Sequence, residues 1–470
     1  MEWHGTFEIP ETGRRVGGRL TIDAGTSILT TFGALTTAEG DPVTDLLDED
    51  DRVLTMVWCF TEDGQRLTLL DLLSLGGSLG SVGNELATTR QDWIVGSAVA
   101  AQLEPTNPVT FASMSFGLTD LSAWMQSPRH EQDTRWDDPI IKLTATNKDS
   151  GELRVGDLTL SFGGALGTRT GFDSVTLDYP ARIVGTPGRE MRWEEIVNTV
   201  VTPIEALIWV ATGRFNALIE PKVRLDGERP QYSRLWVSPL QPRGYVAPEH
   251  RLVESQMLFT APEMPDGLEV GLTRWFGIWD QIRPAFGPVI ARFRAPFTYS
   301  NDQFHAGVAG LESYSDQRHG PPGPCKRERR ERRDRIRASM NASAPDLTEF
   351  VIDAVKEAER PRLRAGLTYL LEEAGEIGLA LTGGDTGSFV SAVVKARHAF
   401  AHSTRIVGAI EGGPALHWTS RGLNWVLRYH ALREIGFDAE AASERVLNNY
   451  VFKQEAQRLR DALGDPEASE

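Results

Sequence analysis

The chain has 470 residues, of which 40% are hydrophobic and 24% are charged, and this composition is typical of a soluble globular protein with two or three domains. The net charge of −16 arises entirely in the first 325 residues, which hold 27 basic and 43 acidic side chains, whereas the rest of the chain holds 22 of each. This distribution argues against bulk nucleic-acid binding by the first part and permits a local RNA-binding face in the second.

Secretion and membrane insertion are also disfavoured. The first residues lack the basic segment and apolar run of a signal peptide, and the most apolar window, residues 197–211, is interrupted by Pro203 and Glu205. Cys59 and Cys325 are far apart and have no His or Cys at zinc-ligand spacing, so neither a disulfide framework nor a metal site is expected. We therefore expect a cytoplasmic protein with no membrane contact, metal or cofactor.

Residues 1 to about 185 are predicted to form mostly strands. The expected strands are short, rich in β-forming residues and bounded by turn residues. They span residues 19–23, 52–60, 66–70, 109–116, 140–145 and 157–162. Many short strands of this kind indicate a sandwich or an irregular barrel. The glycine-rich segment 76–83 lacks the Lys-Ser/Thr pair of a phosphate-binding P-loop and is predicted to be a loop.

Helical spacing begins after this region. The expected elements are helices over residues 193–212 and 272–286 and strands over residues 234–239 and 256–260. Trp275 and Trp279 lie one turn apart in the second helix. The twelve tryptophans are interpreted as packing residues rather than as a platform for a ligand.

A Gly- and Pro-rich linker at residues 316–324 leads into a basic run at residues 326–337. The run has eight basic and three acidic residues, a local excess of five positive charges. Its candidate RNA-contact residues are Arg327, Arg329, Arg330, Arg332 and Arg333. The alternative is a solvated, flexible face, because acidic residues are interleaved and no aromatic residue lies within the run for base stacking.

The C-terminal part is predicted to be helical throughout. Expected helices span residues 347–359, 361–374, 416–435 and 439–463. Another begins at Asp385 or Ser388, carries Phe389, Val393 and Ala396 on one stripe, and ends near residues 403–404.

This last helix carries a motif that runs from Lys395 to His402 and reads KARHAFAH. Arg397 offers a permanent, forked cation for a phosphate, and His402 can exchange a proton near neutral pH. Residues five apart point about 140° from each other on an ideal helix, whereas His398 and His402 share a face. Arg397 and His402 can therefore meet at one phosphate only if the helix loosens near its end or two chains combine their motifs, and this geometry favours a dimeric site.

The segment RHAFAH resembles the R-polar-x-x-x-H signature of HEPN-domain ribonucleases, whose commonest form has Asn at the position of His398. Near the N-terminus, residues 3–7, 9–11, 17–23 and 32–33 resemble the opening of the ApeA N-terminal domain. Residues 110–124 resemble a later strand of that domain, and residues 305–314 resemble its entry helix into the HEPN part. Together these segments cover most of the chain in the expected order.

The resemblance implies a bacterial anti-phage abortive-infection effector whose HEPN bundles pair through the motif-bearing helices. It also implies a metal-independent ribonuclease that leaves a 2′,3′-cyclic phosphate and a 5′-hydroxyl, with RNA (tRNA among the candidates) as substrate. His402 would act as general base or acid, and Arg397 would stabilise charge on the phosphoryl oxygens. His398 would orient the phosphate or supply a second proton-transfer group, with simple solvent exposure as the alternative.

Lys395, Glu312 and Arg364 are candidate supporting residues, although an ordinary surface ion pair is the commoner explanation for such side chains. Without the family resemblance, Arg397 and His402 would be explained as a helix-end arginine and a packed histidine.

We expect an α+β multidomain protein. A β-rich N-terminal domain with accessory helices spans residues 1–300, and an all-α HEPN bundle spans residues 301–470 with a Pro/Gly and basic insertion at residues 316–337. The acidic N-terminal domain is predicted to restrain or trigger the nuclease in response to a phage-derived signal. Two alternatives remain, namely a catalytically silent bundle that binds RNA or protein, and a ligand-sensing β domain with a helical dimerisation unit.

Overall fold

The computed structural model describes residues 1–23, 26–35, 53–82, 85–105, 108–126, 129–134, 141–146, 151–164, 167–170, 175–178, 181–225, 232–237, 252–294, 299–318, 326–358, 363–401, 410 and 413–464. The chain divides into two compact units, Met1–Thr273 with Phe293–Phe297, and Arg274–Arg292 with Thr298–Glu470. The division falls within helix α5 (Leu268–Arg294). The domain boundary expected between residues 300 and 301 stays a prediction.

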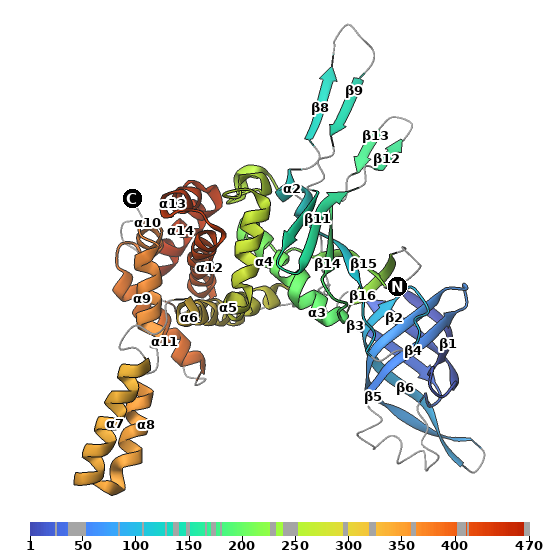
Figure 1. Cartoon of the computed structure of the whole chain (residues 1–470), viewed down its shortest axis with the longest axis horizontal. Coiled ribbons are helices and arrows are strands. Elements are labelled where there is room, and N and C mark those ends of the chain that lie inside the picture. Colours follow the sequence, from blue (N-terminus) through green and yellow to red (C-terminus); the bar gives the residue numbers. More distant parts are fainter. Residues whose placement is uncertain are drawn as a thin grey trace. The chain divides into compact units, whose positions relative to one another are not determined.

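The first unit begins with a closed barrel of six antiparallel strands (Figure 1). The strands are β1 (Glu2–Glu8), β2 (Arg15–Asp23), β3 (Thr26–Phe32), β4 (Val53–Thr61), β5 (Arg66–Val82) and β6 (Glu85–Val99). They pair in the order β6-β3-β2-β1-β4-β5, and β5 pairs back with β6. Alternate side chains point inward, as expected for half-buried strands. Phe7, Leu20, Leu29, Val57 and Trp93 are fully buried in the barrel core.

Strand β6 also belongs to a second, open sheet. Its residues Gln91–Ile94 pair with β3, whereas Ser97–Val99 pair with β16 (Ser233–Val237). The open sheet continues in the order β16-β15-β7-β14-β11-β10, with all neighbouring strands antiparallel. Its remaining strands are β7 (Ser113–Leu118), β10 (Glu152–Val155), β11 (Leu158–Gly164), β14 (Ala181–Pro187) and β15 (Leu218–Arg224). Two separate hairpins are formed by β8 (Arg129–Thr134) with β9 (Ile141–Thr146) and by β12 (Gly167–Thr170) with β13 (Val175–Asp178).

A long apolar helical segment packs within this unit. It comprises α3 (Trp193–Ile196), a π-helical turn (Val197–Val201) and α4 (Thr202–Thr212), which ends at Gly213 in a left-handed conformation. Trp193–Thr212 is long and apolar enough to cross a membrane, but 78% of its apolar window is buried inside the structure, as in the core helix of a soluble protein. A bent pair of described helices, Glu376–Thr382 with Thr386–Ala401, passes the same length and composition test at an angle of 64°.

The second unit is helical. Besides most of α5 it contains α6 (Ser300–Arg318), α7 (Lys326–Ser343), α8 (Thr348–Ala358), α9 (Leu363–Glu373), α10 (Glu376–Thr382), α11 (Thr386–Ala401), α12 (Gly413–Ile435), α13 (Ala439–Asn448) and α14 (Tyr450–Leu463). Helix α12 is the centre of the bundle because it packs against α6 and α14 and is buried over most of its length. A β-rich first part followed by a helical bundle confirms the predicted fold class.

Three predicted elements were wrong. The glycine-rich segment 76–83 is not a loop, because β5 runs through to Val82 and accommodates the glycines by register shifts against β6 and by a positive φ of 109° at Gly76. Residues 256–260 are not a strand; their apolar side chains are buried as an irregular segment between two 3₁₀ turns. The expected helix over residues 439–463 is broken at Asn449, whose Oδ1 accepts hydrogen bonds from the first amides of α14.

The basic run also differs from the flexible alternative, because it forms the regular helix α7, which packs against α8 (Figure 1). The predicted linker at residues 316–324 is helical up to Arg318, where α6 ends, and residues 319–325 lie outside the described part of the chain.

Candidate functional site

Helix α11 presents the basic motif. Its N-terminus is fixed by Asp385, whose Oδ1 accepts a hydrogen bond from the Ser388 amide at 2.9 Å, and this bond lowers the pKa of the Asp385 carboxyl. A buried stripe that includes Phe389, Val393 and Ala396 faces the bundle, as predicted. Because this stripe sets the rotation of the helix, Lys395 and His398 point away from the bundle and are exposed.

Arg397 lies at the edge of the buried face and pairs with Glu312 of α6. Its Nη2 is 3.5 Å from the Glu312 Oε2, and the two side chains are 38% and 31% exposed. The separation is longer than that of a strong charge-assisted hydrogen bond, and partial exposure weakens the attraction further. Arg397 is therefore held in place beside α6 while part of its guanidinium remains accessible.

The two motif histidines differ in how far the structure describes them. His398 is exposed on the last turn of α11. His402 directly follows Ala401, the last residue of α11, and lies with residues 403–409 outside the described part of the chain. The meeting of Arg397 with His402 and the expected helix end near residues 403–404 therefore stay predictions.

A third histidine, which was not among the residues predicted for the site, lies at the same place. His305 of α6 is half-buried, and its ring lies edge-to-face against Phe400, with the ring centroids 5.3 Å apart. Phe304 contacts the same phenyl ring at 5.8 Å. His305 and Glu312 are seven residues apart, so both project from one face of α6 towards the last turns of α11. The spacing shows that His305 and Glu312 share a face of α6, but only the packing of Phe400 against α6 identifies His305 as a neighbour of the motif.

Arg364 and Lys395 have different surroundings. Arg364 of α9 donates a hydrogen bond from Nη1 to the Ser391 hydroxyl at 2.6 Å and so joins α9 to α11. Ser391 precedes Arg397 by six residues, which is about 9 Å along the helix axis at a rise of about 1.5 Å per residue. Lys395 is exposed on α11. Of the three candidate supporting residues, Glu312 is the one that the structure places against Arg397.

The helix that carries Glu312 is anchored to the centre of the bundle. Tyr314 donates a hydrogen bond from its hydroxyl to Glu434 Oε1 at 2.7 Å, and Arg318 pairs with both carboxylate oxygens at 2.6 and 2.9 Å. Burial and the neighbouring Glu434 carboxylate raise the pKa of the Tyr314 phenol, so Tyr314 remains a hydrogen-bond donor. These bonds fix α6 on α12 and thereby fix the position of Glu312.

A second charged cluster lies inside the bundle between α12 and α14. Arg421 pairs with Glu455 Oε1 at 2.9 Å through Nε and at 2.6 Å through Nη2, and the Trp425 indole donates to the other carboxylate oxygen at 2.7 Å. The buried Arg428 guanidinium lies 4.0 Å from the Trp425 ring. Burial, with the Arg421 charge, lowers the pKa of Arg428 to about 9 and that of Arg292 to about 10. Glu455 is the acidic partner of this cluster.

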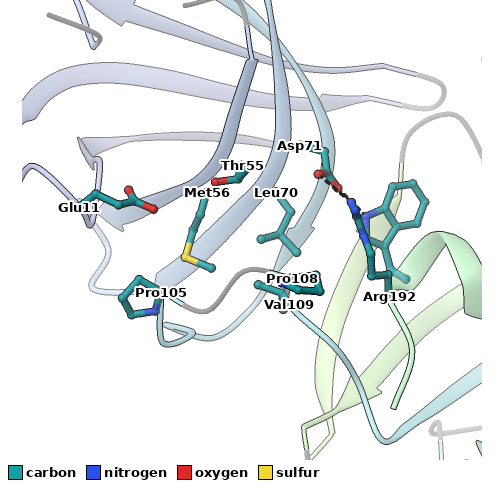
Figure 2. A pocket seen from close by; sticks show the side chains of 10 residues that line it. Glu11, Thr55, Met56, Leu70, Asp71, Pro105, Pro108, Val109 and Arg192 are labelled. Atoms are coloured by element: carbon teal, nitrogen blue, oxygen red, sulfur yellow. Dashed lines mark hydrogen bonds and ion pairs between the residues drawn. The ribbon is translucent and has the colours of Figure 1, made fainter. Parts of the chain in front are cut away.

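The first unit has an open pocket beside strands β4 and β5 (Figure 2). Met56, Leu70 and Val109 give it an apolar part, and Asp71 and Arg192 lie at one side (Figure 2). The other lining residues are Glu11, Thr55, Pro105, Pro108 and Trp193.

Asp71 is held in an unusual conformation beside this pocket. Its φ of 54° lies in the left-handed region, which is costly for a residue other than glycine. Its carboxylate accepts hydrogen bonds from Arg192 Nη2 at 3.1 Å and from the Trp193 indole at 3.0 Å. Gly96 of β6 makes room for it, because a Cβ at Gly96 would lie 3.1 Å from the Asp71 Cβ. The side chain is thus directed to the pocket wall at the expense of regular strand geometry.

Within the described residues, no group of three or more His, Cys, Asp or Glu side chains is arranged to hold a metal ion. The free thiol of Cys59 is buried in the barrel core, and burial raises its pKa to about 12. Cys59 is therefore a packing residue.

The fold and the motif define a protein with an all-helical HEPN unit that follows a β-rich unit. Residues 2–275 match the ApeA N-terminal domain 1 family, and residues 306–441 match the Apea-like HEPN family. The chain therefore belongs to the ApeA-like family, and its HEPN domain indicates an anti-phage effector of a class whose members are generally ribonucleases. Neither the comparison with curated proteins nor the comparison with solved structures gave a match.

Proposed function

We propose that this protein is an endoribonuclease that cleaves RNA during phage infection with Arg397 and His402 as its catalytic residues. The observation that carries the proposal is the placement of Arg397, which is half-exposed on α11 and held by a long ion pair with Glu312. Such a guanidinium can exchange its carboxylate partner for a phosphate at little cost, since exposed ion pairs contribute only about 0–1 kcal/mol.

The chemistry is a transesterification within the RNA chain. A histidine takes the proton of a ribose 2′-hydroxyl, and the oxygen attacks the adjacent phosphorus. The bond from phosphorus to the 5′-oxygen breaks, and that oxygen takes a proton from a second acid, which leaves a 2′,3′-cyclic phosphate and a 5′-hydroxyl. Arg397 stabilises the charge that develops on the phosphoryl oxygens. His402 supplies one of the two proton transfers, and His398 is the candidate for the other.

A dimer is part of the proposal. Arg397 and His402 would point about 140° apart on a continuous helix, so two copies of α11 that pair side by side would bring the arginine of one chain to the histidine of the other. Sedimentation analysis should then give a dimer, and mixing Arg397→Ala with His402→Ala chains should restore part of the activity in heterodimers.

The first test is to incubate the native protein and its variants with total cellular RNA in EDTA and to map the new ends. Arg397→Ala and His402→Ala should each lower the cleavage rate by about 10²-fold or more, and Arg283→Ala, which removes an exposed arginine from the same helical unit, should have no effect. If the native protein cleaves only when infected-cell extract is added, the enzyme requires a trigger. If RNA binds under both conditions and is never cleaved, the protein is a catalytically silent RNA-binding module.

The pocket in the first unit is the candidate site for such a trigger. It combines an apolar wall with a strained Asp71, and strained residues are concentrated at ligand sites and switches. Thr55 lines the pocket from an exposed position, so Thr55→Trp should fill it and abolish activation by infected-cell extract. Thr273→Trp, at an exposed position outside the pocket, is the control. Unchanged activation in Thr55→Trp would exclude the pocket as the trigger site.

A further inference from the structure

The α7–α8 hairpin carries a separate concentration of positive charge. Helix α7 has an inner stripe of half-buried side chains, which includes Ile336 and Met340 and lies towards α8, and an outer face on which Arg327 and Arg335 are exposed, with Arg330 exposed at its edge. The outer face therefore presents guanidinium groups to solvent along more than two turns of a regular helix.

Acidic residues are interleaved with the exposed arginines, but they form only weak ion pairs with them. Arg327 and Glu331 are 3.7 Å apart, Arg330 and Asp334 are 4.0 Å apart, and all four side chains are more than 60% exposed. Ion pairs of this kind between residues i and i+4 contribute only about 0.3–0.5 kcal/mol, so a phosphate can readily take the place of either carboxylate. The whole helix has eight basic residues against three acidic ones. Its exposed positions include Arg327, Arg330, Arg332 and Arg335 together with all three acidic residues, so the positive surplus on the exposed side is small.

An exposed aromatic ring lies next to this basic helix. Phe350, in the first turn of α8, is 74% exposed, and Leu347, just before it, is 49% exposed. Ile352 points the other way and is buried. The connection between α7 and α8 is short, since only residues 344–347 separate them, so the ring lies near the C-terminal end of α7. The basic run itself contains no aromatic residue, and the hairpin supplies one in Phe350.

The hairpin is connected at both ends to helices that hold α11. It is inserted between α6, which contacts Arg397 through Glu312, and α9, which contacts Ser391 through Arg364. A chain bound along the hairpin would therefore be tethered to the same helical unit that carries the motif.

We propose that the α7–α8 hairpin is a binding site for single-stranded RNA, in which the outer arginines contact backbone phosphates and Phe350 stacks on an unpaired base. This inference rests on the proposed ribonuclease function and assigns its substrate contacts. The exposed arginines favour an anionic partner, and the exposed Phe350 ring, which can stack on a base, favours RNA over a membrane or a protein. Stacking on Phe350 requires a base that is free of a duplex, which selects single strands or loops.

The experiment measures the affinity of the full-length Arg397→Ala protein for a labelled 12-nucleotide RNA by fluorescence anisotropy over a range of salt concentrations. Each phosphate contact in a single strand contributes about 0.7 to the slope of log affinity against log salt. Arg327→Gln with Arg335→Gln should therefore lower the slope by about 1.4 and weaken binding at low salt by about tenfold or more. Arg66→Gln with Arg283→Gln removes two exposed arginines on other elements and should change neither quantity.

Phe350 is tested separately. Phe350→Ala should weaken binding by about tenfold without changing the salt slope, since a base–aromatic stack is worth about 1–3 kcal/mol, whereas Phe350→Trp should keep the affinity. Binding of a duplex of the same length should not depend on Phe350. Circular dichroism of each variant verifies that the hairpin remains helical.

The outcomes separate this proposal from the ribonuclease proposal. Unchanged RNA affinity and an unchanged salt slope in the double arginine variant would overturn the RNA site. The proposal would also be overturned if this variant lost self-association or vesicle binding but kept its affinity for RNA. If the native protein cleaves RNA but the hairpin variants bind and cleave as well as it does, the hairpin assignment alone fails. If the hairpin-dependent binding is seen and cleavage is never found, the assignment holds and the ribonuclease proposal fails.

Discussion

Two glutamate–arginine pairs in the helical unit differ in a way that separates packing from function. Glu455 and Arg421 are 2.6 Å apart, with side chains 11% and 25% exposed, and the Trp425 indole shares the carboxylate. Glu312 and Arg397 are 3.5 Å apart, with side chains 31% and 38% exposed. The first pair is short and supported by a third group, whereas the second is long and open to solvent.

The difference shows how one bundle can contain an arginine with a permanent partner and another arginine whose partner a substrate can displace. An arginine that must bind a substrate phosphate needs a partner that positions it and can be displaced, and a half-exposed carboxylate at 3.5 Å satisfies both conditions. A buried arginine needs a permanent partner, because an uncompensated buried charge is costly. Variants of the two glutamates should therefore have opposite consequences for stability and for RNA.

The largest effect is expected for Glu455→Gln. This change removes the acidic partner of a cluster that includes Arg421 and the buried Arg428, so the free energy of unfolding should fall by about 3 kcal/mol. Urea denaturation followed by circular dichroism measures it, and Glu376→Gln, at an exposed position on α10, is the control. A loss no greater than that of the control would contradict the role assigned to Glu455.

Trp425→Phe should have a smaller effect on the same cluster. Phenylalanine keeps a ring for Arg428 and Phe452 but removes the indole N–H that donates to Glu455. Loss of this charge-assisted hydrogen bond should lower the free energy of unfolding by about 1.5–3 kcal/mol. In a double-mutant cycle with Glu455→Gln the two losses should not add, and simple additivity would show that the bond contributes nothing.

Glu312→Gln should leave stability nearly unchanged, within about 1 kcal/mol, because its ion pair is partly exposed. It should instead raise the affinity of the protein for RNA at low salt, since the carboxylate no longer competes with phosphate for Arg397. Anisotropy with Glu372→Gln, an exposed glutamate on α9, as control measures the affinity. A fall in RNA affinity would mean that Glu312 serves to orient Arg397 for the substrate rather than to compete with it.

The smallest effect concerns pH and His417. Burial and the nearby Arg421 and Arg292 charges lower the pKa of His417 below its usual 6.5, although the Glu455 charge opposes this shift. The unfolded chain then binds a proton at a pH where folded His417 does not, so stability is complete above pH 6.5 and falls as the pH is lowered towards the folded pKa. Denaturation at pH 8, 7, 6 and 5.5 should show a shallower decline for His417→Gln than for the native chain, and parallel curves would contradict the assignment.

The sequence predicted the elements that have strong periodicity. The apolar stripe of α11 gave the correct buried face because Phe389, Val393 and Ala396 recur at helical spacing. The glycine-rich end of β5 was misassigned because strand pairing overrides local turn preference, and no local signal marks the partner β6. The break at Asn449 was missed because a capping amide inside an amphipathic pattern preserves the period on either side.

The site was predictable only in part. Arg397 and His398 follow from the motif, and Glu312 followed from its place on a neighbouring predicted helix. His305 required the packing of Phe400 against α6, and Phe350 required the pairing of α7 with α8. Both depend on how two helices meet, which the pattern of a single helix does not contain.

Strand β6 has a consequence for how the first unit unfolds. The barrel and the open sheet share this one strand, since β3 and β16 pair with successive stretches of it. Separating β6 from its neighbours would open the barrel and detach β16 in one event, so we expect the unfolding of the two sheets to be coupled. We therefore expect the amide protons of both sheets to exchange with solvent through a common cooperative opening. A ligand that stabilised one sheet would then also stabilise the other.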